Sequence, residues 1–227
     1  MLRRMKNGAW GLGLLAVLSV SRGALAQVPP PKTGFQMALR TGYSAPFGKV
    51  TEGLKLSDFS SGQVPLIVDI GGKPIPHLFL GGYLGLGFGG AGGSTADTCD
   101  QLNAGCFGLS LRFGIQAQVH FLPGEKFNPW LGYGIGLESL GLGIDQNDSR
   151  GAVAAGVGGF EFAHLMAGAD VRLTRVIGIG PFVDFSFGRY NRVTLDDGDT
   201  TTSYDIESSN RATHGWATFG LRVVFFP

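Results

Sequence analysis

Apolar and polar positions alternate with a period of two along most of the chain beyond residue 34. This period is typical of β-strands whose two faces meet different surroundings. In the last such stretch, 214–225, one face carries Phe219, Leu221, Val223 and Phe225. The opposite face of this stretch is mostly small or polar, so the pattern predicts a strand with one large apolar face.

Seven further stretches show the same alternation: 35–43, 64–70, 78–88, 107–121, 131–138, 165–173 and 177–188. The stretch 107–121 is longer than a typical strand of a soluble domain. A tilted strand that crosses a membrane needs about 9–11 residues in the apolar layer and can project beyond it. In the sixth stretch, Phe160 and Phe162 have the opposite parity to Leu165, and a β-bulge near Ala163 would reconcile the two parities.

The segments between these strands are alternately long and short, starting with the polar segment 48–62. The sequence therefore predicts an all-β fold, an eight-stranded antiparallel up-and-down transmembrane β-barrel over residues 34–226. The large apolar side chains would face lipid and the glycines and charges would face the lumen. No helical period is seen within this range. A soluble periplasmic barrel that binds lipid remains an alternative, and it would stay in solution without detergent.

The beginning of the chain predicts export. Basic residues at Arg3, Arg4 and Lys6 precede an apolar run and the small-residue motif Ala24-Leu25-Ala26. This order is typical of a secretory signal peptide, here 1–26, although an uncleaved anchor is an alternative. A short Pro-rich leader, 27–33, follows. Charged residues make up only 15% of the chain and the net charge is +1, so no nucleic-acid partner is expected.

The lumen face of the predicted strands carries four basic and four acidic residues. They are Arg40, Asp69, Arg112, Glu138, Asp170, Arg172, Asp184 and Arg222. Buried charges need partners, and an eight-stranded barrel is just wide enough to be filled by side chains. We therefore expect a salt-bridge network that closes the lumen. The alternative is that these charges line a narrow, gated ion path.

Two features concern the segments between strands. Cys99 and Cys106 lie in one Gly- and Asp-rich segment of an exported chain, which favours a disulfide over a two-Cys metal site. The run Asp196-Asp197-Gly198-Asp199 offers oxygen ligands for Ca²⁺, but a solvated acidic loop is the favoured interpretation. No metal or cofactor is expected.

Enzymatic activity would need an activated nucleophile. The histidines are His77, His120, His164 and His214. The last two are expected near the outer rim, and Ser208 and Ser209 lie in the adjacent loop. None of these histidines is adjacent to a serine in the sequence, so we expect no catalytic residues. A barrel enzyme that modifies lipid A is the less favoured alternative.

The closing strand resembles the C-terminal assembly signal of bacterial outer-membrane barrels at Thr218, Gly220, Val223 and Phe225, although Phe226 and Pro227 follow it. Together with the strand pattern, the chain resembles the small OmpA/OmpX-type barrels. The resemblance implies a location in the bacterial outer membrane, contact with its lipid and lipopolysaccharide, and recognition by the barrel-assembly machinery. It also implies a structural role or a role in binding an unknown ligand through the outer loops.

Overall fold

The computed structural model describes residues 33–101, 105–145, 153–196 and 200–226. The expected signal peptide, 1–26, and all but the last residue of the expected leader lie outside the described residues. Asp197, Gly198 and Asp199 of the acidic run also lie outside them.

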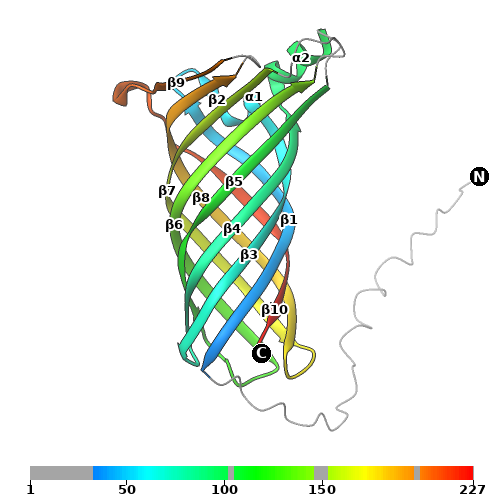
Figure 1. The fold of residues 1–227 in the computed structure, drawn as a ribbon. Coiled ribbons are helices and arrows are strands. Elements are labelled where there is room, and N and C mark those ends of the chain that lie inside the picture. Colours follow the sequence, from blue (N-terminus) through cyan, green and yellow to red (C-terminus); the bar gives the residue numbers. More distant parts are fainter. Residues whose placement is uncertain (1–32, 102–104, 146–152, 197–199, 227) are drawn as a thin grey trace, which may run out of the picture.

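Eight long strands form a closed barrel (Figure 1). They are β1 (Gly34–Thr51), β3 (Ser60–Ile75), β4 (Leu78–Ala91), β5 (Gly105–His120), β6 (Phe127–Asp145), β7 (Val153–Arg172), β8 (Ile177–Asp196) and β10 (His214–Phe225). Each strand pairs antiparallel with the next in this series, and β10 also pairs with β1, from Met37↔Phe225 to Gly48↔His214. The predicted eight-stranded antiparallel up-and-down barrel is confirmed.

The short elements gather at the end of the barrel where the long connections lie (Figure 1). They are β2 (Leu54–Lys55), α1 (Leu56–Phe59), α2 (Gly93–Gln101), β9 (Thr201–Asp205) and the 3₁₀ turn η1 (Ser208–Asn210). The expectation that the barrel range contains no helix was wrong. Helix α2 is polar, so its sequence has no apolar period from which a helix could be predicted. It is held by the Cys99–Cys106 disulfide and by contacts with α1. Of the helices described here, none has the length and apolar character to cross a membrane.

The two faces of the barrel have the predicted polarity. Large apolar side chains stand exposed on the outside, among them Ile115 at 66%, Phe219 at 59% and Phe107 at 57%. Charged and amide side chains are buried inside. This arrangement is the reverse of that of a water-soluble barrel, whose core is apolar.

The bulge expected near Ala163 is present. The pairing of β7 with β8 shifts register between Glu161 and Ala163, and its pairing with β6 shifts between Gly134 and Gly136. Phe160 and Phe162 consequently face outwards, while Glu161 is fully buried in the lumen. The bulge thus places both the apolar and the charged residues of β7 on their proper faces.

Candidate functional site

The middle of the lumen is organised by Arg40 on β1. Its Nε and Nη2 donate to Asp69 Oδ2 and Oδ1 at 3.0 and 2.8 Å, and its Nη1 donates to Asp184 Oδ2 at 3.1 Å. All three side chains have zero exposure. The planar guanidinium fork suits this bidentate contact with one carboxylate and leaves an Nη for the second.

A second arginine, Arg222 on β10, lies nearer the end with the short turns. Its Nη1 donates to Asp170 Oδ2 at 2.9 Å and its Nη2 donates to Gln118 Oε1 at 3.0 Å. The guanidinium also lies 4.3 Å from the centroid of the Trp130 ring. Arg40 and Arg222 occupy directly opposed positions on β1 and β10. These like charges are tolerated side by side because each has its own carboxylate.

Two glutamines of β5 connect these two arginine clusters. Gln118 Nε2 donates to Gln116 Oε1 at 3.2 Å, and Gln116 Nε2 donates to Asp69 Oδ1 at 2.8 Å. Polar contacts therefore run without a break from Asp170 to Asp184. They are carried by side chains of β1, β3, β5, β7, β8 and β10.

The contacts continue from Asp184 towards the end with the long connections. His164 lies between two carboxylates, with Nε2 3.2 Å from Asp184 Oδ2 and Nδ1 3.6 Å from Glu161 Oε1. Glu161 accepts a 2.6 Å hydrogen bond from Tyr83 and lies 3.8 Å from Arg112 Nη1. Arg112 also donates to Ser186 Oγ at 3.0 Å.

Glu138 on β6 forms a further cluster close to the end of the lumen with the long connections. Its Oε1 accepts hydrogen bonds from Tyr190 Oη at 2.7 Å and from Trp216 Nε1 at 2.8 Å. His214 Nε2 lies 3.4 Å from Glu138 Oε2. The His214 ring stacks on the Tyr190 ring, with 3.7 Å between the ring centroids. A single buried carboxylate thus ties β6, β8 and β10 together.

Apolar side chains close over the lumen at the end with the long connections. A buried cluster is formed there by Val50, Leu56, Leu140, Val157, Tyr190, Ile206 and Trp216. Leu56 belongs to α1 and has zero exposure, and Ile206 follows β9, so the segments outside the barrel wall contribute directly. At the other end, Phe226 packs with Ala38 and Val224, and its ring lies 5.2 Å from Lys73 Nζ and 5.4 Å from Arg172 Cζ.

The eight charged residues expected in the lumen are all buried there, with exposures between 0 and 6%. Arg172 sits at the short-turn end, where its Nη2 donates to the carbonyl of Pro123 at 3.0 Å. The strand pattern did not place Glu161, His164 or the tyrosines in the network, nor the buried Lys73 in the lumen. Glu161 had a usable signal, because it lies between two outward phenylalanines. Lys73 had none, because it lies in a Gly/Pro segment that resembles a turn.

The remaining candidate residues have simple outcomes. Cys99 and Cys106 form a disulfide. His120, His164 and His214 are buried in the lumen, while His77 bonds the carbonyl of His120 through Nδ1 at 2.8 Å. Within the described ranges, no group of three or more His, Cys, Asp or Glu side chains is arranged to hold a metal ion. Asp196 accepts a 2.9 Å hydrogen bond from Thr201.

The residues of the expected assembly signal lie on β10, whose pairing with β1 closes the barrel. Thr218 points into the lumen and its hydroxyl lies 2.7 Å from Ser44 Oγ. Gly220 opposes Gly42, and Val223 and Phe225 pair with Leu39 and Met37.

No protein-family model matches the chain, and no curated protein matches it. Among solved structures, a major outer membrane protein from Thermus thermophilus superposes with a TM-score of 0.54, at 11% identity over 84% of this chain and 98% of that one. The chain has the fold of a small outer-membrane β-barrel.

Two further barrels were found at lower structural similarity. Neisserial surface protein A gives a TM-score of 0.42 at 13% identity, covering 84% of this chain and 96% of that one. The N-terminal barrel domain of Pseudomonas aeruginosa OprF gives 0.36 at 14% identity, covering 86% and 97%.

Proposed function

We propose that this barrel is a non-enzymatic integral protein of the bacterial outer membrane, with a salt-bridge-filled lumen that does not conduct. The apolar outer surface supports membrane insertion, because so many exposed large side chains would strongly favour aggregation in water. Its role is structural, or it binds a partner through the segments at the end with the long connections. In this proposal the end with the long connections faces the outside of the cell, and the short turns face the periplasm.

The observation that carries the proposal is the contact of Arg40 with two carboxylates in the middle of the lumen. Removing such a side chain from its partners leaves uncompensated charge in a poorly solvated space, so the ion pairs resist opening. The apolar cluster around Leu56 covers one end and Phe226 fills part of the other. The side chains that fill the cross-section of the lumen and the side chains that cover its ends together support a lumen that does not conduct.

A narrow gated channel is the alternative, and one observation favours it. The polar contacts form a continuous file along the lumen from Asp170 to Arg112. If these side chains rearranged, they would offer hydrophilic groups to a passing ion at successive depths of the membrane.

Single-channel recording in a planar bilayer tests the two functions. The protein is first shown to be folded by its heat-dependent mobility on a gel. Silence of the wild type, with Arg112→Ala silent and less stable, is the expected result for a sealed scaffold. Discrete openings of the wild type that become larger in Arg112→Ala would establish the channel and overturn the sealed lumen.

The non-enzymatic part of the proposal has its own test. The burial of His120, His164 and His214 inside the lumen supports it, because a lipid substrate reaches the outer wall of a barrel rather than its charged interior. The folded protein is incubated with lipid A, and the mass of the lipid is then measured by mass spectrometry. An unchanged mass is expected, and any protein-dependent loss or gain of an acyl chain would contradict the proposal.

A further inference from the structure

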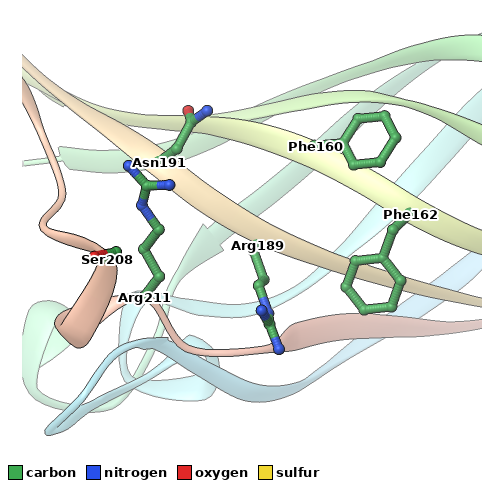
Figure 2. A pocket seen from close by; sticks show the side chains of 6 residues that line it. All are labelled: Phe160, Phe162, Arg189, Asn191, Ser208 and Arg211. Carbon is green, nitrogen blue, oxygen red and sulfur yellow. The ribbon is translucent and has the colours of Figure 1, made fainter.

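A pocket lies on the outer wall of the barrel, near the end with the long connections (Figure 2). It has a volume of about 570 Å³ and is lined by Phe160, Phe162, Arg189, Asn191, Ser208 and Arg211. These residues come from β7, β8, η1 and the segment that leads into β10. A volume of this size is in the range of pockets that hold small molecules.

Polarity changes along this pocket. Figure 2 shows Ser208, Asn191 and Arg211 towards one end and the two phenylalanine rings towards the other, with Arg189 between them. Phe160 and Phe162 are 47% and 37% exposed. The pocket is therefore amphipathic, with its polar part towards the rim and its apolar part on the barrel wall.

Both arginines are fixed through Nε, which leaves their terminal nitrogens available. Arg189 Nε donates to Thr213 Oγ1 at 3.2 Å, and Arg211 Nε donates to the carbonyl of Ile206 at 2.9 Å. Within the part of the chain that the structure describes, neither guanidinium has a carboxylate within 4.0 Å. Their positive charge is thus presented to the surroundings rather than neutralised by the protein.

The strands themselves mark the depth of this pocket in the membrane. The outward positions of β8 are apolar through Val183, Phe185 and Phe187 and become polar at Arg189 and Asn191. Phe160 is the direct partner of Arg189 on β7. Aromatic residues are typical of the boundary between the apolar layer and the headgroups, so this polarity change places the arginines at headgroup level.

We propose that the pocket binds a phosphorylated lipid of the leaflet at this end of the barrel. Arg189 and Arg211 bind the phosphate, Asn191 and Ser208 provide hydrogen bonds to the adjoining headgroup, and Phe160 and Phe162 contact the first part of an acyl chain. Charge-assisted hydrogen bonds from guanidinium to phosphate are among the stronger polar contacts in proteins. The inference rests on the proposed membrane location and adds to it a specific binding site.

The test measures binding of bisphosphorylated lipid A to the folded barrel in a non-ionic detergent by native mass spectrometry. The variant is Arg189→Gln/Arg211→Gln. The control is Lys126→Gln/Arg175→Gln, which removes the same charge at exposed positions beside the short turns. We expect affinity to fall about tenfold or more in the variant and by less than about twofold in the control. Phe160→Ala/Phe162→Ala should also weaken binding.

Equal affinity of the variant and the wild type, or an equal loss in the control, would overturn the site. Inorganic phosphate is added as a competitor. Displacement of the lipid by phosphate at equal concentration would show that the pocket selects a free anion, which would also overturn it. These outcomes would overturn the lipid site but not the proposed membrane location. The membrane location would be contradicted by a different result, a barrel that remains in solution without detergent.

Discussion

Arg40 and Asp69 form a two-point contact in the middle of the barrel, with Nε–Oδ2 and Nη2–Oδ1 distances of 3.0 and 2.8 Å. The two residues are on neighbouring strands but are not directly opposed, because Asp69 pairs with Ala38 and Arg40 pairs with Ile67. The contact is therefore diagonal, and it leaves Nη1 of the arginine directed at Asp184 across the lumen.

Replacement of Arg40 by Met should strongly destabilise the barrel. Asp69 and Asp184 would both lose a charged partner at zero exposure. Loss of one member of a buried ion pair costs about 3–5 kcal/mol in the free energy of unfolding. Urea titration of the protein refolded in phospholipid vesicles measures this free energy. Lys49→Met, which breaks the exposed Lys49–Glu52 pair, should cost about 0–1 kcal/mol.

Similar losses in the Arg40 and Lys49 variants would contradict a structural role for the lumen charges. The stability of the barrel would then have to come from the strand pairing and the apolar outer surface alone.

Replacement of Glu138 by Gln should destabilise the end of the barrel with the long connections. The carboxylate accepts hydrogen bonds from Tyr190 and Trp216 through one oxygen and lies beside His214 with the other. The amide removes the negative charge, so the hydrogen bonds from Tyr190 and Trp216 lose their charged acceptor, which should lower the free energy of unfolding by about 1–3 kcal/mol. Glu125→Gln, in an exposed turn, is the matched control and should change it by less than about 0.5 kcal/mol. The same urea titration measures both variants. An unchanged urea midpoint of unfolding in Glu138→Gln would show that this cluster does not hold β6, β8 and β10 together.

Gly220→Ala should impair closure of the barrel. Gly220 opposes Gly42 where β10 meets β1, and a Cβ at Gly220 would collide with the carbonyl oxygen of Thr41 and lie 2.7 Å from Gly42 Cα. We expect a lower folded fraction after refolding into detergent, measured on an unheated gel. Because no assembly machinery is present in this experiment, it isolates the steric effect from the expected assembly signal.

Gly72→Ala is the control for this prediction. A Cβ at Gly72 would meet only the carbonyl oxygen of Gly34, at 3.6 Å. Its refolding yield should equal that of the wild type, and an equal loss in both variants would mean that the barrel is generally sensitive to alanine.

Reduction of the Cys99–Cys106 disulfide should loosen α2 without unfolding the barrel. The disulfide links α2 to the beginning of β5, outside the closed ring of strands. Asp-N protease should cleave at Asp97 and Asp100 faster after reduction, while cleavage at exposed Asp205 stays constant. The heat-dependent gel mobility should not change. Loss of folded mobility on reduction would show that the disulfide stabilises the whole barrel.

Much of the architecture was predictable because a β-strand repeats every two residues. The closing strand was expected at 214–225 and is found at His214–Phe225. Even the bulge at Ala163 followed from the parity of Phe160 and Phe162. The strand boundaries at the end with the long connections were less predictable. Strand β8 extends to Asp196 although Arg189, Asn191 and Arg192 interrupt its apolar alternation. Its pairing there with β7 and β9 supplies backbone hydrogen bonds that the side-chain pattern does not encode.

In the regular parts of the strands, the sequence by itself determined which residues face the lumen and which face outwards, since strand parity assigns each side chain to one face. Only the tertiary structure decided which charges meet. Arg112 directly opposes Glu138 on β6, yet it contacts Glu161 and Ser186 across the lumen, while Glu138 binds Tyr190 and Trp216. The barrel's curvature and strand tilt bring distant strands within reach of a long side chain, and residue spacing along the chain carries no record of that distance.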